Sequence, residues 1–199
     1  MGMPDRPARW RDLLRRHRTN ARRTSHIPKR ANSTMAAGRN ELFQRLAELG
    51  IATSTAEHQP AHTVEEARAM RGSIPGGHCK NLFLKDEKGD IWLLVCLEDS
   101  LIDLKTMPAR IGSRRLSFGK SDLMREVLGV EPGSVTPFGL INDRGRRANV
   151  VLDQAIMGHE LLNFHPLRND ATTTIASADL LTFIRSCGHE PRIVKLGQD

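Results

Sequence analysis

No stretch of this sequence is apolar for long enough to cross a membrane. The longest apolar run is the heptapeptide Ile91-Trp92-Leu93-Leu94-Val95-Cys96-Leu97, whereas a membrane-spanning helix needs about 20 residues. A run of this length is typical of a buried strand. Residues 1–34 also lack the apolar segment of a secretory signal. We therefore expect a protein that acts without a membrane, in the cytoplasm.

Cysteine is scarce as well. The three cysteines, Cys79, Cys96 and Cys187, are too few and too scattered for a disulfide framework or a zinc site, and a reducing compartment suits them. His58 and His62 are four residues apart, but Pro60 disrupts the helix that would align them as metal ligands. We expect neither a metal nor another cofactor.

The usual catalytic signatures are missing. The sequence has no Gly-x-Ser-x-Gly elbow, no phosphate-binding Gly-x-x-x-x-Gly-Lys-Ser/Thr loop and no dinucleotide-binding glycine pattern. His78 and Cys79 are adjacent, but neighbouring strand residues point to opposite faces and make a poor catalytic dyad. The lack of a credible nucleophile favours direct attack by water or help from the substrate itself.

The positive charge is concentrated at one end. Residues 1–35 hold ten of the 30 Lys and Arg residues and two of the 23 acidic residues, a net charge of +8, which leaves 20 basic and 21 acidic residues, a net charge of −1, in 36–199. Three interpretations of residues 1–34 remain open: a tail that binds RNA phosphates, an organelle transit peptide, or a disordered basic leader. We expect one domain over 35–199.

Hydrophobic periodicity and breakers predict a chain that alternates unevenly between helices and strands. The expected helices cover 38–49, 63–70, a short piece of 103–111 broken by Pro108, 122–128 and 177–187. The expected strands cover 52–58, 79–85, 90–97, 114–118, 148–153, 160–164, 172–177 and 192–196. The expected helix caps are a capping box of Thr63 with Glu66, and the side chains of Ser121 and Ser177. Residues 130–140 are expected to form a loop. Several strands are joined as hairpins, so an α/β or α+β fold with a mixed sheet is expected rather than a doubly wound parallel one.

Three places could carry chemistry. Lys80 and Asn81 follow a Pro-Gly-Gly turn at the start of an apolar strand, where a lysine can bind an anion or be tuned for catalysis, or can be an ordinary edge residue. In Gly133-Ser134-Val135-Thr136-Pro137 the glycine lets backbone N–H groups face a ligand, unless this is only a turn. His165 ends a strand before Pro166 and can bond a ligand or its own backbone.

The same three places occur in this order in a known family. The stretches Gly76–Leu84, Gly133–Leu140 and Asn163–Asn169 resemble those of the YbaK/ProX-type aminoacyl-tRNA deacylases, which are related to the insertion domain of bacterial prolyl-tRNA synthetase. The resemblance is greatest to the single-domain Ala-tRNA(Pro) deacylases called ProXp-ala or PrdX. It covers about 35–196 and implies a mixed, largely antiparallel sheet surrounded by helices.

The resemblance also implies an activity, the hydrolysis of the ester between alanine and the 3′ end of tRNA(Pro). Lys80 would hold the phosphate or ribose of the terminal nucleotide, and Asn81 would orient the substrate or the water. The backbone of Gly133, Ser134, Val135, Thr136 and Pro137 would grip the aminoacyl group, and His165 would close a small side-chain pocket. Proline would be excluded by its size.

The implied partner is the acceptor end of tRNA(Pro), with prolyl-tRNA synthetase or an elongation factor as a transient partner. Arg114, Arg115 and Lys120 are candidates for contacts to the acceptor stem. Two alternatives stay open: a deacylase for another small aminoacyl-tRNA, charged with Cys or Ser, and a non-catalytic module that binds tRNA or a synthetase.

Overall fold

The computed structural model describes residues 36–58 and 74–197. The basic segment 1–34 and the predicted helix 63–70, with its Thr63–Glu66 capping box, lie outside these residues. No helix within the described ranges combines the length and the apolar character that a membrane span requires.

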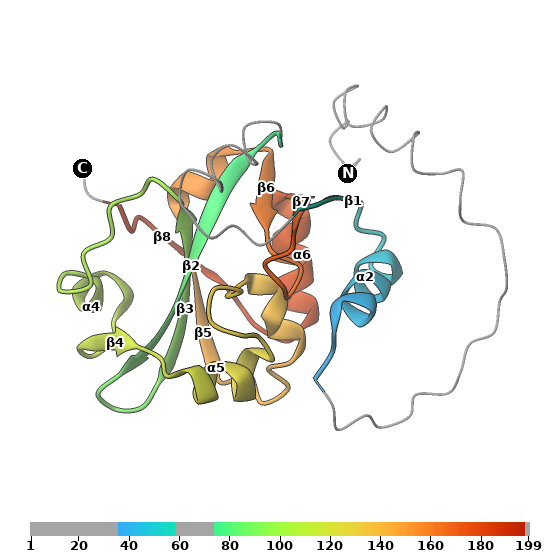
Figure 1. Ribbon diagram of the computed structural model, residues 1–199. Coiled ribbons are helices and arrows are strands. Elements are labelled where there is room, and N and C mark those ends of the chain that lie inside the picture. The colour runs from blue at the N-terminus through green and yellow to red at the C-terminus, as the bar shows by residue number, and fades with distance from the viewer. Residues whose placement is uncertain (1–35, 59–73, 198–199) are drawn as a thin grey trace, which may run out of the picture. The chain divides into compact units, whose positions relative to one another are not determined.

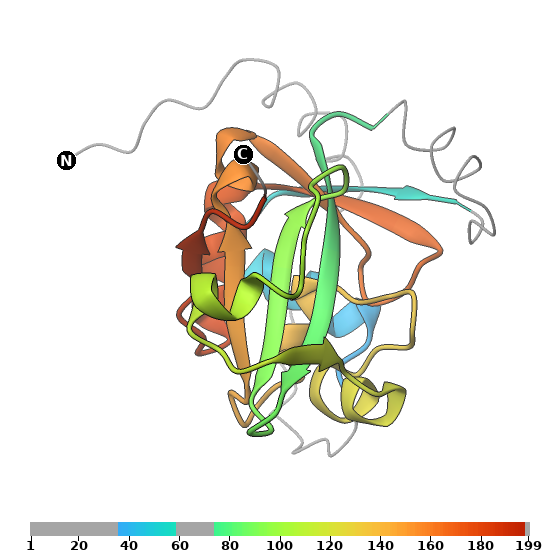
Figure 2. The same ribbon diagram turned by 90° about the vertical axis from the view of Figure 1, so that its left-hand side faces the viewer.

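The described chain folds into one mixed sheet with helices on both faces (Figures 1 and 2). The strands are β1 (Thr53–Glu57), β2 (Gly77–Asp86), β3 (Ile91–Leu97), β4 (Leu116–Phe118), β5 (Ala148–Asp153), β6 (Leu161–Phe164), β7 (Ala171–Ala176) and β8 (Arg192–Val194). The helices are α2 (Arg39–Glu48), α4 (Met107–Ile111), α5 (Ser121–Leu128) and α6 (Ser177–Ser186), with the 3-10 turns η2 (Pro137–Ile141) and η3 (Gln154–Gly158). The expected α/β fold with a mixed sheet is confirmed.

The strands lie in the order β1-β7-β6-β2-β3-β5-β8, and β4 pairs with the outer part of β2. Four neighbouring pairs are antiparallel, β1–β7, β6–β7, β2–β3 and β2–β4. The pairs β2–β6, β3–β5 and β5–β8 are parallel. The sheet therefore joins an antiparallel group of strands, β1-β7-β6, to a second group, β2-β3-β5-β8, through the short parallel pairing of β6 with β2.

Strand β3 explains the uninterrupted apolar heptapeptide of the sequence. It lies between β2 and β5 and is buried on both faces. Leu93 and Val95 pack into a core with α2, α5, η2 and α6, whereas Trp92 and Leu94 pack into a second core with α4. Figure 1 shows α4 and α6 on opposite sides of β2, β3 and β5. A strand covered on both faces loses the polar alternation of a half-exposed one.

The turn between β2 and β3 is built by Asp86. The Asp86 carboxylate accepts hydrogen bonds from the backbone N–H groups of Lys88 and Asp90 (2.9 and 3.0 Å) and of Arg114 (3.1 Å). Burial alone would raise the pKa of this carboxyl group, but the backbone donors outweigh it and the net pKa is lowered. One side chain thus closes the hairpin and attaches the segment before β4 to it.

The helices differ from the expectation in four respects. Pro108 does not break a helix; it lies in the first turn of α4, where a missing N–H is tolerated. Ser121 and Ser177 are the first helical residues of α5 and α6, and the capping positions are Lys120 and Ala176, without a side-chain cap. The predicted loop 130–140 includes the start of η2, and η3 was not expected at all.

Candidate active site

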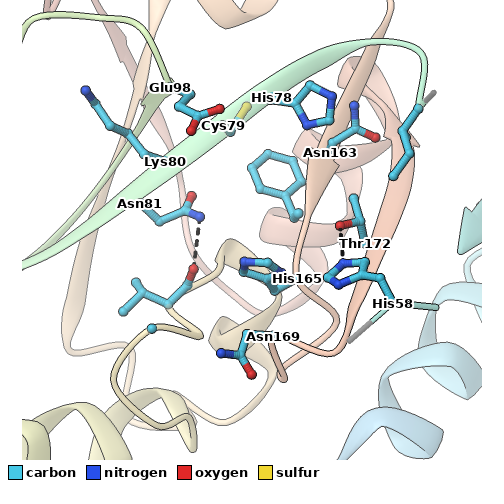
Figure 3. A pocket seen from close by; sticks show the side chains of 14 residues that line it. His58, His78, Cys79, Lys80, Asn81, Glu98, Asn163, His165, Asn169 and Thr172 are labelled. Carbon is cyan, nitrogen blue, oxygen red and sulfur yellow. Dashed lines mark hydrogen bonds between the residues drawn. The ribbon is translucent and has the colours of Figure 1, made fainter. Parts of the chain in front are cut away.

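A cavity of about 460 Å³ opens where strands β2 and β6 separate. The two strands pair only through Gly77 with Leu162 and His78 with Asn163. Beyond these pairs β2 continues beside β3, whereas β6 ends at Phe164. Five of the residues predicted from the sequence line the cavity together: Lys80, Asn81, Gly133, Val135 and His165 (Figure 3).

The side chain of Asn81 joins two of the predicted stretches directly. Its Nδ2 donates a hydrogen bond of 2.9 Å to the backbone carbonyl of Val135. Since a carbonyl oxygen only accepts, this partner fixes which end of the amide is nitrogen. The other end, Oδ1, is buried and has no hydrogen-bond partner among the residues that the structure describes. A buried acceptor without a partner costs free energy, so Oδ1 is suited to accept a bond from a ligand or a water.

Lys80 faces the opposite side of β2, because successive strand residues alternate between the two faces. Leu82 and Leu84 on its face pack into the core under α4, whereas Phe83 on the Asn81 face belongs to the other core. The Nζ of Lys80 donates to the backbone carbonyl of Ser100, in the loop after β3. Figure 3 shows its side chain directed away from the Asn81–Val135 contact. Its charge therefore lies at the border of the cavity.

The Gly133 loop divides into a part that lines the cavity and a part that anchors it. Gly133, with φ of +86°, and Val135 line the cavity. The side chains of Ser134, Thr136 and Pro137 are buried and do not line it. Thr136 caps η2 by accepting the N–H of Phe138 at 3.3 Å. These anchors hold in place the backbone that Asn81 contacts.

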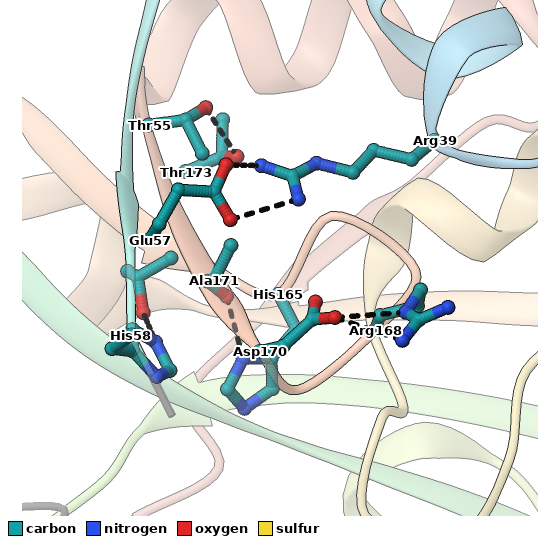
Figure 4. Close-up of polar contacts among 10 residues, drawn as sticks. Arg39, Thr55, Glu57, His58, His165, Arg168, Asp170, Ala171 and Thr173 are labelled. Carbon is teal, nitrogen blue, oxygen red and sulfur yellow. Dashed lines mark hydrogen bonds and ion pairs between the residues drawn. The ribbon is translucent and has the colours of Figure 1, made fainter. Parts of the chain in front are cut away.

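Two imidazoles close the end of the cavity away from Lys80 (Figures 3 and 4). The Nδ1 of His165 bonds to the carbonyl of Ala171 at 3.1 Å, so Nδ1 carries the hydrogen and Nε2 is the acceptor of the neutral ring. His58 follows β1, and its Nε2 lies 2.9 Å from Thr172 Oγ1. The ring centroids of the two histidines are 6.5 Å apart, edge to face. His58 reaches the site through the pairing of β1 with β7, which leaves no local signal in the sequence.

Asn163 also lines the cavity; it begins one of the resembling stretches, but no role was predicted for it. It is 3% exposed, its Nδ2 donates to the carbonyl of Pro75 at 3.1 Å, and its Oδ1 accepts the hydroxyl of Thr174 at 2.7 Å. Both ends of the amide are thereby satisfied. Asn163 fixes the turn that leads into β2, so it positions Lys80 and Asn81 rather than offering groups to a ligand.

Cys79 also lines the cavity, but its thiol is protonated at neutral pH. Burial raises its pKa to about 12, with a smaller contribution from the nearby Cys96. The thiolate is the nucleophilic form of cysteine, so Cys79 is unsuited to covalent catalysis. Across the described residues, no group of three or more His, Cys, Asp or Glu side chains is arranged to hold a metal ion.

The predicted RNA-contact residues lie outside the cavity lining. The backbone of Arg114 bonds to Asp86 at the hairpin end of β2, and Arg115 directly precedes β4. Lys120 occupies the capping position of α5. None of the three lines the cavity.

Comparison with known families and proteins places these features in context. Residues 58–183 match the model of the aminoacyl-tRNA editing domain. The chain is 40% identical over 166 residues to "Prolyl-tRNA synthetase associated domain-containing protein 1" of Bos taurus, covering 81% of this chain and 96% of that protein. It is 35% identical over 156 residues to "Prolyl-tRNA editing protein ProX" of Acetoanaerobium sticklandii, covering 78% and 95%.

The fold is shared with solved structures. A crystal structure of a candidate trans-editing enzyme for prolyl tRNA synthetase superposes with a TM-score of 0.61. It covers 80% of this chain and 97% of that one at 22% identity. At that identity the likeness concerns the arrangement of helices and strands.

Proposed function

This chain belongs to the aminoacyl-tRNA editing domain family, of the type that edits prolyl-tRNA, and from that premise we propose that it hydrolyses the ester of mischarged Ala-tRNA(Pro) in the cytoplasm. The observation that supports this most strongly is the hydrogen bond from Asn81 to the carbonyl of Val135. It connects the Lys80–Asn81 strand to the Gly133 loop at one cavity, where an ester can meet polar groups from both.

Each of these groups has a role that its contacts allow. Lys80 supplies a point charge at the cavity border for the phosphate or ribose of the terminal nucleotide. Asn81 Oδ1 accepts a bond from the attacking water or from the substrate. The backbone of the Gly133 loop binds the aminoacyl group, and His165 limits the space for its side chain.

The proposed reaction needs no protein nucleophile. The oxygen of a water attacks the ester carbonyl carbon, the bond to the ribose oxygen breaks, and that oxygen takes up the proton that the water loses. The neighbouring ribose hydroxyl already activates this ester, so the enzyme has to position the reactants and stabilise the developing oxyanion. The protonated Cys79 thiol agrees with attack by water.

Selection between alanine and proline would be local. A cavity of about 460 Å³ holds far more than an alanyl group, so its total size cannot exclude proline. The distinction has to arise where the side chain is received, at the end closed by His165 and Phe164. A synthetase gains only about 1–3 kcal/mol of discrimination from one methylene, and a second site that admits only the smaller product removes the error.

The test is deacylation of Ala-tRNA(Pro), Pro-tRNA(Pro) and Ala-tRNA(Ala), by the full chain and by a chain without residues 1–34. We expect hydrolysis of Ala-tRNA(Pro) in preference to Pro-tRNA(Pro), unchanged by a chelator. Ser-tRNA and Cys-tRNA in the same panel test the alternative substrates. Binding of tRNA without hydrolysis of any ester would instead identify a non-catalytic module.

A further inference from the structure

A second cavity, of about 190 Å³, lies at the edge of the sheet between the beginning of β5 and β8. Figure 2 shows these strands side by side, with α4 in front of them. Arg146, His189 and Arg192 are among the residues that line it. It is separate from the active-site cavity, and the proposed hydrolysis uses none of its residues.

Arg146 is held at this cavity by an unusual backbone. Its φ is +52°, in the left-handed region that few arginines adopt. Its guanidinium lies directly on Gly188, where a Cβ would come within 2.5 Å of Nε. In the described part of the chain its side chain makes no hydrogen bond or ion pair. The positive charge of Arg146 is therefore not neutralised by another of the described residues.

The second arginine is also without a carboxylate partner among the described residues. Arg192 Nη1 donates to the carbonyl of Ile111 at 2.7 Å, which fixes the guanidinium without neutralising it. The acidic residue of the lining is Glu190, whose carboxylate is taken by Arg185 through bonds of 3.1 and 2.9 Å. The cavity thus keeps an excess of positive charge.

A buried pair braces the loop that carries Arg146. His189 is 6% exposed, with Nδ1 3.2 Å from the carbonyl of Ala148, and its Nε2 lies 3.6 Å from Asp143 Oδ2 without a hydrogen bond. The Asp143 carboxylate accepts the N–H groups of Arg147 and Ala148 at 3.0 and 2.8 Å. Little ordering entropy would be lost when a ligand binds a loop fixed in this way.

We propose that this cavity binds a phosphate group of the tRNA backbone, at a nucleotide other than the one that carries the ester. The inference rests on the proposed tRNA substrate. Arg192 pairs with Val151, which belongs to the core under α4, whereas Arg146 lies on Gly188, just after α6. Three strand spacings, about 14 Å, separate β2 from β8, so a phosphate bound between the two arginines belongs to a nucleotide away from the one at Lys80.

The test measures binding of uncharged tRNA(Pro) by fluorescence anisotropy across a range of KCl concentrations. Arg146→Asn removes the charge and places at φ of +52° a residue that tolerates it, so loss of fold does not explain an effect. Arg192→Gln is the second variant. Arg125→Gln is the matched control, because Arg125 is exposed and already paired with Asp122 and Glu131.

We expect Arg146→Asn to weaken tRNA binding about three- to tenfold at low salt and to reduce the slope of log K against log [KCl] by about one. The control should leave both quantities unchanged. An unchanged salt slope in both variants would overturn the proposal. It would also be overturned if inorganic phosphate competed with tRNA for the protein while both variants bound tRNA as the parent does. Because the tRNA carries no aminoacyl group, the binding result is independent of hydrolysis. A protein that binds tRNA through Arg146 yet cleaves no ester would refute the proposed deacylase activity and leave this phosphate site standing.

Discussion

Replacing Asn81 by Asp tests whether the contact between β2 and the Gly133 loop organises the site. The substitution keeps the shape of the side chain but exchanges the Nδ2 donor for an oxygen. Two oxygens would then face each other across the 2.9 Å that now separates Asn81 Nδ2 from the Val135 carbonyl. Leaving partly buried polar groups without a partner costs about 1–3 kcal/mol in the free energy of unfolding, unless the loop moves away.

Movement of the loop is the catalytically informative outcome. A displacement of 1 Å in a positioned group can lower a rate by about 100-fold, so we expect a loss of that order in single-turnover hydrolysis of Ala-tRNA(Pro). The rate is measured with saturating enzyme, so that weaker tRNA binding does not enter. Urea unfolding of the same protein gives the stability.

A matched control separates stability from catalysis. Asn142 makes the same kind of bond, from Nδ2 to the carbonyl of Leu128 at 3.0 Å, and lines neither cavity. Asn142→Asp should destabilise the fold by a similar amount and leave the saturated rate unchanged. A folded Asn81→Asp enzyme with a rate within a few-fold of the parent would refute the reasoning.

Three further predictions follow from individual positions. The Cys79 thiol, with its pKa raised to about 12, should resist alkylation by iodoacetamide at pH 7.5, and rapid alkylation of the native protein at that pH would contradict this. Its contribution to the free energy of unfolding is complete below pH 9. That contribution should be lost as the pH rises from 9 towards 12, because the thiol of the unfolded chain ionises first. His165→Ala should lower the ratio of Ala-tRNA(Pro) to Pro-tRNA(Pro) hydrolysis by about tenfold, because it enlarges the side-chain pocket; an unchanged ratio would remove His165 from selection. In a urea titration, Gly76→Ala should lower the free energy of unfolding by about 1–3 kcal/mol, since φ is +107° and the new Cβ would lie 2.7 Å from the carbonyl oxygen of Leu161. The control is Gly158→Ala, whose new Cβ meets no atom within 4 Å, so its free energy of unfolding should be unchanged.

The sequence predicted the elements of the described chain better than their pairing. Local patterns were sufficient for β3, whose seven apolar residues reflect burial on both faces. They could not show that β2 and β6 pair over two residues and then separate. That separation creates the cavity, and it depends on contacts between residues more than 80 positions apart.

The candidate site was predicted in part for the same reason. Lys80, Asn81, Gly133, Val135 and His165 line one cavity, and their common position is a tertiary result. The alternation of side chains along a strand already implies that Lys80 and Asn81 face opposite sides, a consequence that the sequence interpretation did not draw.

The roles of two other site residues could not be predicted from local patterns. His58 owes its place to the β1–β7 pairing, which a short window of sequence does not contain. Asn163 begins the stretch Asn163–Asn169 that carries the resemblance, but its bond to the Pro75 carbonyl is visible only in the fold. The predictions of helix caps at Ser121 and Ser177 were wrong for a different reason. Ser at the start of a helix suits both the capping and the first helical position, and only the backbone distinguishes them.

The proposed function requires that this cavity hydrolyses alanyl esters and spares prolyl esters on the same tRNA. The most direct measurement follows the loss of labelled alanine and of labelled proline from tRNA(Pro), in parallel time courses with saturating enzyme. We expect hydrolysis of the alanyl ester at least about tenfold faster than that of the prolyl ester, with the difference diminished in His165→Ala. Equal rates for the two esters, or no hydrolysis of Ala-tRNA(Pro) by the folded protein, would contradict the proposed function.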